Sequence, residues 1–335
     1  MTAIRAPLFS VVITTYNRGE LLADAIKSVL MQQGAPSFEV IAVDNNSTDN
    51  TREVITALQR SFGEQLRYVF EAKQGASNGR NAGIAASRGE FVAFTDDDVR
   101  ADQNWLATIK REFDANPSTA FVGGRVYPRW PAAVPEWLTS DHWSPLALVD
   151  YGAEAFAVDM RRPVCLVSAN LAVRKSALNE FGGFDPFQQH LDGAVAATED
   201  HELQLRMIRG DHPGRYSPEV LMRADVQLHR MHKAYHRKWH AQHGRAVTRL
   251  LQANEAFDSQ MLPTPAARSV RQLFSVPLWV YRQFLSSAMS ALGDLIRGQE
   301  SRAFWHECQA REALGMFRGY RERSTRVTAG RGHGK

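Results

Sequence analysis

The stretch that decides the fold reads Phe91-Val92-Ala93-Phe94-Thr95-Asp96-Asp97-Asp98. Residues 91–95 are apolar or β-prone and have the length of a buried strand, so the three carboxylates follow where that strand leaves its sheet. Like charges this close repel unless a positive charge lies among them. A divalent cation with oxygen ligands would relieve that repulsion, and the carboxyl end of an α/β strand is a common place for a phosphorylated ligand. A solvated acidic turn is the alternative that the stretch leaves open.

Strand and helix patterns alternate before this stretch and continue after it. Apolar runs predict strands over 9–15, 38–43, 66–70, 91–95, 120–126 and 164–173. Apolar spacing of three and four predicts helices over 20–33, 50–62, 78–87, 105–113 and 199–209. Residues 127–149 read as a long irregular loop with three tryptophans, either a lid over an acceptor or anchors in a core. The alternation indicates an α/β fold with a helix-covered parallel sheet.

The C-terminal part of the chain is basic. Residues 201–335 contain 22 Lys and Arg against 11 Asp and Glu, whereas residues 1–200 contain 18 against 25. This asymmetry predicts an anionic partner such as phosphate or a membrane surface. A nucleic-acid binder would explain only the basic part, so no nucleic acid is expected. Histidines recur at helical spacing and are expected to face phosphate, lipid or solvent: His232, His236, His240 and His243.

Residues 276–296 predict an amphipathic helix. Leu278, Leu285 and Leu292 share one face, while Arg282 and Asp294 interrupt the apolar pattern. Charges within a stretch of this length argue against a membrane span. The helix either lies on a membrane, mediates association with another chain, or packs against its own domain.

Cysteine usage indicates a reducing compartment. Cys165 and Cys308 are the only cysteines, too few for a disulfide scaffold or a four-cysteine zinc site. We expect a cytoplasmic protein, peripheral at the inner face of the cytoplasmic membrane if the basic part meets lipid.

A series of short motifs occurs in a defined order along the chain. They are Val12-Ile13-Thr14-Thr15-Tyr16-Asn17-Arg18, Val43-Asp44-Asn45-Asn46-Ser47-Thr48-Asp49, Gly79-Arg80-Asn81-Ala82-Gly83, Phe94-Thr95-Asp96-Asp97-Asp98, Gly182-Gly183-Phe184-Asp185 and Glu199-Asp200. Each is weak alone, but in this order they resemble the family 2 glycosyltransferases of GT-A fold. The resemblance covers roughly residues 8–245.

The resemblance implies a Rossmann-like, mainly parallel mixed sheet with a C-terminal helical extension. It implies a catalytic domain over 1–232, with a nucleotide-binding half over 1–125 and an acceptor half over 126–232, followed by a basic helical region over 233–335. It further implies an enzyme that transfers a hexose from a nucleotide sugar and inverts the configuration at the anomeric carbon. The favoured donor is a UDP-sugar, and the expected metal cofactor is Mn²⁺ or Mg²⁺. The acceptor would be a glycan or a lipid-linked glycan in cell-surface polysaccharide synthesis.

The donor side of the site is expected at the carboxyl edge of the sheet. Asp44 follows a strand there and could bind the base, although Asp44 also has the chemistry of an Asx turn. By resemblance, the nucleotide-binding residues are Thr15, Tyr16, Arg18, Asp44, Arg80, Asp96 and Asp97. Asp98 or Asp97 would hold the metal, and Asp96 would contact the ribose. His229, which is expected just after a last strand, would be a further metal ligand.

The acceptor side needs a general base to deprotonate a hydroxyl. By resemblance, Asp200 is that base and Glu199 its neighbour, although helix N-termini favour acidic residues anyway. Acceptor contacts are expected from Trp130, Asn170, Gly183, Phe184 and Asp185.

Two features depart from the family pattern. Ala197-Thr198 replaces a glycine often found before the acidic pair, and the Gln-x-x-Arg-Trp motif of processive synthases is absent. A single-addition enzyme is therefore expected. A nucleotidyltransferase with a similar sheet and a non-catalytic nucleotide-sugar or glycan-binding scaffold stay open as alternatives.

Overall fold

The computed structural model describes residues 6–188, 196–253 and 271–330, which fall into two compact units. The first unit comprises residues 6–131, 147–188 and 199–226. The second comprises 132–146, 196–198, 227–253 and 271–330. The predicted boundary at 232 and the two predicted halves of the catalytic domain stay predictions.

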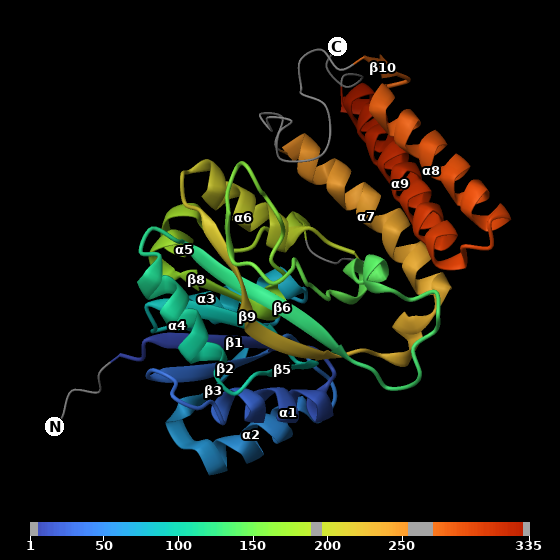
Figure 1. The fold of residues 1–335 in the computed structure, drawn as a ribbon. Helices are drawn as coiled ribbons and strands as arrows, with labels where there is room; N and C mark the ends of the chain where they lie inside the picture. Colours follow the sequence, from blue (N-terminus) through green and yellow to red (C-terminus); the bar gives the residue numbers. More distant parts are fainter. Residues whose placement is uncertain (1–5, 189–195, 254–270, 331–335) are drawn as a thin grey trace. The chain divides into compact units, whose positions relative to one another are not determined.

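Within the described residues, the first unit is built on a nine-stranded mixed sheet (Figure 1). Its strands are β1 (Phe9–Thr15), β2 (Phe38–Asp44), β3 (Leu66–Phe70), β4 (Phe91–Asp96), β5 (Val99–Ala101), β6 (Phe121–Arg129), β7 (Phe156–Val158), β8 (Leu171–Arg174) and β9 (Gly214–Asp225). The order is β3-β2-β1-β4-β8-β6-β9-β5, with β7 paired to β9. Strands β1 to β4 are parallel, and β8 runs antiparallel to β4 and β6. The predicted α/β fold is confirmed.

Six helices accompany this sheet among the described residues. They are α1 (Gly19–Leu30), α2 (Thr51–Phe62), α3 (Ala76–Ala86), α4 (Trp105–Ala115), α5 (Lys175–Phe181) and α6 (Glu199–Arg209). Figure 1 shows α1 and α2 side by side along the part of the sheet that holds β1 to β3. Strands β1, β2 and β4 are buried along nearly their whole length, as expected for parallel strands covered on both faces.

Helix α3 lies unusually close to β1 because two glycines face that strand. A Cβ atom at Gly79 would lie 2.3 Å from Cγ2 of Thr14, and one at Gly83 would lie 2.3 Å from Cγ1 of Val12. Any larger side chain would push the helix away from the sheet. The close approach positions Arg80 beside the carboxyl edge of the sheet.

Several predicted elements differ from the structure. The strand expected over 164–173 is wrong, because residues 168–170 form a 3-10 turn and β8 begins only at Leu171. The sequence pattern missed β5, β7 and α5, and it predicted a last strand before His229 without giving its bounds. Strand β9 alternates buried with partly exposed positions and contains Pro218, so its apolar run is too broken to stand out. The loop expected over 127–149 starts later, since β6 continues to Arg129, and it contains short 3-10 turns over Ser140–His142 and Ser144–Leu146.

A buried carboxylate links the amino ends of the first strands. Glu39 on β2 accepts hydrogen bonds from the Ser10 hydroxyl (2.7 Å), from the Arg67 guanidinium (2.8 Å) and from Arg88 (2.6 Å). Burial opposes ionisation, but the bonds from Arg88, Ser10 and Arg67 outweigh it and lower the pKa of Glu39 to about 2.

Replacing Glu39 with glutamine is therefore expected to destabilise the protein in a pH-dependent way. A carboxyl whose pKa falls on folding stabilises the native state above its unfolded pKa and loses that effect as the pH falls through the folded value. The free energy of unfolding should drop by roughly 2–3 kcal/mol at neutral pH, and the difference from wild type should shrink between pH 4.5 and about pH 2. Urea unfolding over a pH series measures this, with exposed Glu53→Gln as control. A difference that is constant with pH would contradict the assignment.

The second unit contains a helical bundle, so the predicted helical C-terminal region is confirmed. Its helices are α7 (Lys233–Ala253), α8 (Leu278–Ile296) and α9 (Glu300–Gly330), and a short hairpin of β10 (Gln272–Leu273) and β11 (Val276–Pro277) precedes α8. Helix α9 packs against both α7 and α8. Among the described residues, none of the helices combines the length and hydropathy of a membrane-spanning segment.

Helices α7 and α9 touch backbone to backbone. A Cβ at Gly244 would lie 2.0 Å from the Glu312 carbonyl oxygen, and one at Gly315 would lie 2.2 Å from the Ala241 carbonyl oxygen. Only glycine at these crossing points allows so short a distance between the helices.

The expectation that the histidines of α7 face phosphate, lipid or solvent is wrong for three of them. His236 and His240 are buried, and Nδ1 of His240 and of His243 lie 2.8 Å and 3.1 Å from the two carboxylate oxygens of Glu312 on α9. These histidines hold α7 to α9. Trp137 likewise packs edge-on against His236 and Phe304. This contact agrees with the alternative in which the tryptophans of the loop are anchors in a core.

Candidate active site

Strand register brings the predicted donor-side residues to one edge of the sheet. Thr15 at the end of β1 lies opposite Asp44 at the end of β2, and Thr14 lies opposite Asp96 at the end of β4. The carboxyl ends of these three parallel strands therefore meet, as the sequence predicted.

The Arg18 guanidinium compensates part of the negative charge of the aspartate triplet. The Arg18 Nη1 group donates to Oδ1 of Asp97 (3.0 Å) and to Oδ2 of Asp98 (3.1 Å). The Thr15 hydroxyl donates to the other oxygen of Asp97 (2.7 Å). Burial nevertheless raises the pKa of Asp97 to about 6, against the attraction of Arg18. Asp97, Thr15 and Arg18 thus bind one another and stiffen the edge of the site.

Arg80 joins the donor side to the acceptor side. Its Nη2 atom lies 3.4 Å from Oδ1 of Asp96, and its Nη1 atom lies 3.0 Å from Oε1 of Glu199 and 3.7 Å from Oδ1 of Asp200. The guanidinium carbon is 5.3 Å from the ring centre of Phe184, within the range of a cation–π contact. One nearly buried arginine therefore compensates three carboxylates from two distant parts of the chain.

The two oxygens of the Asp200 carboxylate have different surroundings. Oδ2 accepts from the backbone N–H of Ser168 (2.9 Å), whereas Oδ1 is buried, lies 3.7 Å from Nη1 of Arg80 and accepts no hydrogen bond within the described part of the chain. Burial raises the pKa of Asp200, although Arg80 opposes the shift. A fixed carboxylate with a raised pKa and one oxygen that accepts no hydrogen bond has the properties of a general base.

The loop after α5 is attached to α3. The Asn81 side chain donates to the Phe184 carbonyl (2.8 Å) and accepts from the Phe184 N–H (2.8 Å), and the Ser77 hydroxyl donates to the Asp185 carbonyl (3.3 Å). A Cβ at Gly183 would lie 2.2 Å from Oδ1 of Asn81. Gly183, Phe184 and Asp185 are thereby held next to Arg80.

Two supporting residues were not among the predicted site residues. Asn81 orients the loop that carries Phe184, and Ser168 orients Asp200. The position of Asn81 next to Arg80 in its motif was the signal available for the first. Ser168 donates to Asp200 through its backbone N–H, and its side chain also favours the charged form of that carboxylate.

Asp44 has the contacts of a turn residue. Its Oδ1 atom accepts from the Ser47 N–H (2.9 Å), and its Oδ2 atom accepts from the Tyr68 hydroxyl (3.0 Å). The Asx-turn alternative is therefore present in the structure, and base binding by Asp44 stays a prediction.

Asn170 uses its side chain inside the sheet. Its amide oxygen accepts from the Trp105 indole (2.8 Å), and its amide nitrogen donates to the carbonyls of Arg125 and Val220 (2.9 Å each). These bonds engage both ends of the amide, so contact with an acceptor would have to displace one of them. Tyr16, in contrast, is exposed beyond β1, and Trp130 is half-buried beyond β6.

The aspartate edge supplies carboxylate oxygens, the ligands that Mg²⁺ and Mn²⁺ prefer. Each aspartate of the triplet already has an arginine partner: Arg18 binds Asp97 and Asp98, and Arg80 binds Asp96. Thr15 also engages Asp97, so both oxygens of that residue accept hydrogen bonds. Within residues 6–188, 196–253 and 271–330, no group of three or more His, Cys, Asp or Glu side chains is placed to hold a metal ion.

His229 belongs to the second unit, and its metal role stays a prediction. A strand, β9, precedes His229 as expected, but it ends at Asp225, and His229 lies in a 3-10 turn over Leu228–Met231.

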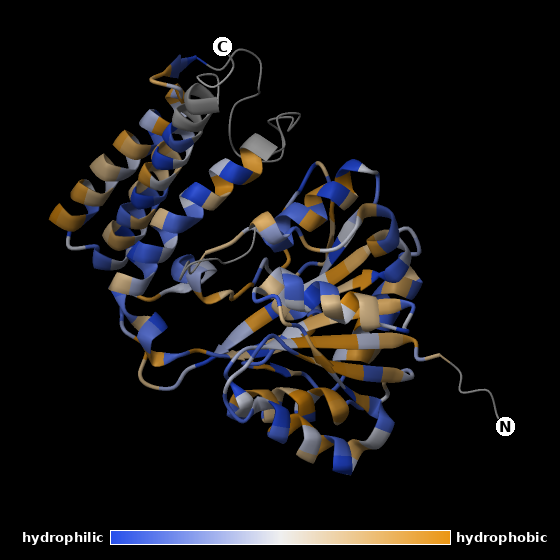
Figure 2. Cartoon of the chain, turned by 180° about the vertical axis from the view of Figure 1, so that it is seen from behind, coloured by the Kyte–Doolittle hydropathy of each residue, from blue (hydrophilic) through white to orange (hydrophobic). Residues whose placement is uncertain are grey.

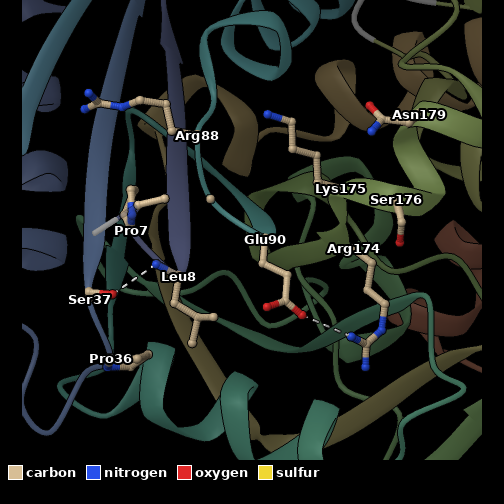
Figure 3. Close-up of a pocket in the computed structure, with 12 residues that line it drawn as sticks. Pro7, Leu8, Pro36, Ser37, Arg88, Glu90, Arg174, Lys175, Ser176 and Asn179 are labelled. Atoms are coloured by element: carbon tan, nitrogen blue, oxygen red, sulfur yellow. Dashed lines mark hydrogen bonds and ion pairs between the residues drawn. The ribbon is translucent and has the colours of Figure 1, made fainter. Parts of the chain in front are cut away.

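A depression of about 740 Å³ lies at the opposite, amino-terminal edge of the strands (Figure 3). Arg88 binds Glu39, and Arg174 pairs with Glu90 (3.7 Å), so two of its cations have a carboxylate partner. Lys175 donates to the Ser87 carbonyl, a contact that does not neutralise its charge. The lining contains none of the predicted site residues.

Curated relatives match part of the chain. A glucosyl-dolichyl phosphate glucuronosyltransferase of Haloferax volcanii is 30% identical over 182 residues, which covers 52% of this chain and 55% of the relative. A GalNAc(5)-diNAcBac-PP-undecaprenol beta-1,3-glucosyltransferase of Campylobacter jejuni is 37% identical over 120 residues, covering 35% and 38%. The chain thus spans about half, or less, of the length of these relatives.

A solved structure supports the fold over nearly the whole chain. The mannosyltransferase PcManGT of Pyrobaculum calidifontis, in complex with GDP-Man and Mn²⁺, superposes with a TM-score of 0.61 at 16% identity, covering 94% of this chain and 88% of that one. The GT-A fold expected from the motifs is therefore confirmed. The model for glycosyl transferase family 2 matches residues 10–182, just over half of the chain, and this protein belongs to that family.

Proposed function

We propose that this protein transfers a sugar, with inversion, from a nucleotide-diphosphate sugar to a hydroxyl of a glycan or lipid-linked acceptor. The observation that carries the proposal is the position of Arg80, which binds Asp96 at the end of β4 and the Glu199-Asp200 pair at the start of α6. Donor-side and acceptor-side carboxylates are thereby adjacent within one unit, which a transfer between two substrates requires.

The donor would lie along the carboxyl edge of the sheet, beside Asp44, Asp96 and Asp98. Asp98 or Asp97 would hold Mn²⁺ or Mg²⁺, which supplies positive charge to the departing diphosphate, and Asp96 would contact the ribose. Thr15 and Arg18 hold Asp97 in place and thereby fix the geometry of its neighbours. A UDP-sugar remains the favoured donor, although the similar mannosyltransferase structure contains GDP-Man.

Asp200 would act as the base. Its Oδ1 atom would accept the proton of the acceptor hydroxyl while the oxygen attacks the anomeric carbon, which inverts the configuration there. Arg80 and the Ser168 N–H fix the carboxylate for that step. The names of the two curated relatives refer to dolichyl phosphate and undecaprenol carriers. A polyprenyl-linked acceptor and a peripheral location at the inner face of the cytoplasmic membrane are therefore part of the proposal.

Calorimetric titration with UDP, GDP and dTDP, each with and without Mn²⁺, tests the donor site. We expect one nucleotide to bind in a metal-dependent way and the Asp96→Ala/Asp98→Ala variant to bind it at least about a hundredfold more weakly. Asp114→Ala on α4, an exposed carboxylate of the same unit, is the matched control. If folded wild-type protein binds none of the nucleotides, the donor-site assignment is wrong.

A further inference from the structure

Helix α8 exposes an apolar stripe to solvent within the second unit. Leu285, Met289, Leu292 and Ile296 are each between 57% and 79% exposed. They recur at intervals of four, three and four residues, so they line one side of the helix. Large aliphatic side chains in a continuous row at this exposure are unusual on a protein surface without a partner.

The opposite side of α8 is occupied. Val280, Ser287 and Asp294, spaced seven residues apart, are buried on that side, and the helix packs there on α9. Val280 belongs to a core cluster with Ala313 and Met316 of α9. Figure 2 shows the hydrophobic residues that continue along α8, the helix at the edge of this bundle. The stripe is therefore a second apolar face of α8, separate from the face that packs on α9.

The surroundings of the stripe are cationic. Arg271 and Arg282 are exposed near the start of α8. Arg297 and Arg302 are exposed near its end, where both form ion pairs with Asp294 (3.3 Å and 3.8 Å) and where Glu300 is exposed, so the cationic flank is the start of the helix. The only carboxylate of α8 is Asp294, which is buried. An apolar row flanked by arginines complements a surface that is apolar inside and anionic outside.

We propose that this face of α8 docks on an anionic membrane surface. A second copy of the chain fits less well, because two such faces would bring Arg271 and Arg282 of each copy together without an exposed carboxylate of α8 to compensate them. The aliphatic residues would enter the boundary between headgroups and acyl chains while the arginines stay at the phosphates. This inference rests on the second unit alone and does not depend on the transfer reaction.

Flotation of the full-length protein with lipid vesicles tests the inference. The probes are vesicles of phosphatidylcholine alone and of phosphatidylcholine mixed with phosphatidylglycerol, without nucleotide or acceptor. We expect binding to the mixed vesicles that weakens with salt.

The variant Leu285→Gln/Met289→Gln/Leu292→Gln should bind at least about tenfold more weakly, since affinity scales with the apolar area that is buried. Arg271→Gln/Arg282→Gln should bind about twenty-five-fold more weakly, since each arginine near the surface contributes about fivefold.

Met31→Gln, which removes an equally exposed methionine at the position that follows α1, is the matched control and should bind as wild type. Hydrogen exchange on unmodified protein provides a second measurement, with protection over 285–296 expected when mixed vesicles are added. Wild-type protein that fails to float, an α8 variant that floats like wild type, or exchange unchanged by vesicles would overturn the inference. It would also be overturned if velocity sedimentation showed a wild-type dimer that the α8 variant abolishes. Nucleotide binding that fails while flotation succeeds would count against the proposed function only.

Discussion

Replacing Asp200 with asparagine is expected to lower the turnover of sugar transfer by about a thousandfold, within the usual range for a general base. Asparagine keeps the shape of the side chain and can still accept from the Ser168 N–H, but it cannot take a proton from the acceptor. Nucleotide binding should change little, because Asp200 lies on the acceptor side of Arg80. Steady-state kinetics combined with nucleotide titration separate these two effects.

The pH profile offers a further check on Asp200. Burial raises its pKa, so the wild-type rate should fall on acidification at a higher pH than an ordinary aspartate would give. The residual activity of Asp200→Asn should lack that fall in rate on acidification. Glu219→Gln, an exposed carboxylate of the same unit, is the control and should retain both rate and profile. An Asp200→Asn enzyme within tenfold of wild type would exclude Asp200 as the base.

Replacing Arg80 with methionine is expected to lower the free energy of unfolding by about 3–5 kcal/mol and to abolish transfer. The change leaves Asp96, Glu199 and Asp200 without the cation that they share. Because protonation can neutralise those carboxylates, the loss of stability should be smaller at acid pH. Urea unfolding at two pH values measures both expectations.

Matched variants separate charge from packing at Arg80. Arg80→Lys keeps the charge but cannot place two nitrogens on Asp96 and Glu199 at once, so it should recover part of the stability and little of the activity. Glu199→Gln in the methionine background should also recover stability, since one unpaired charge is removed. Arg111→Met breaks an exposed pair with Glu219 and should cost less than about 1 kcal/mol. A methionine variant as stable as wild type would show that Arg80 compensates none of the three carboxylates.

Much of the fold could be predicted from local patterns. Apolar runs located β1 to β4 and β6, and apolar spacing of three and four located five of the six helices of the first unit, because each pattern is carried by neighbouring residues. The bounds of β9 could not be predicted because Pro218 and alternating partly exposed residues interrupt its apolar run, and its pairing with β6 follows from long-range register. Likewise, the histidines of α7 have a helical spacing, but nothing in that spacing indicates that Glu312, about seventy residues later, binds two of them.

The sequence by itself determined the order of the motifs, and with it the family, the parallel strands and the carboxylates at the sheet edge. Those features depend on residues that are close along the chain. Only the tertiary structure decided which cation each carboxylate meets: Arg18 binds Asp97 and Asp98, whereas Arg80 reaches Glu199 across 119 positions. That pairing depends on how closely α3 approaches β1 at Gly79 and Gly83 and on where α6 begins. Such distances are set by the packing of whole elements, which no local periodicity encodes.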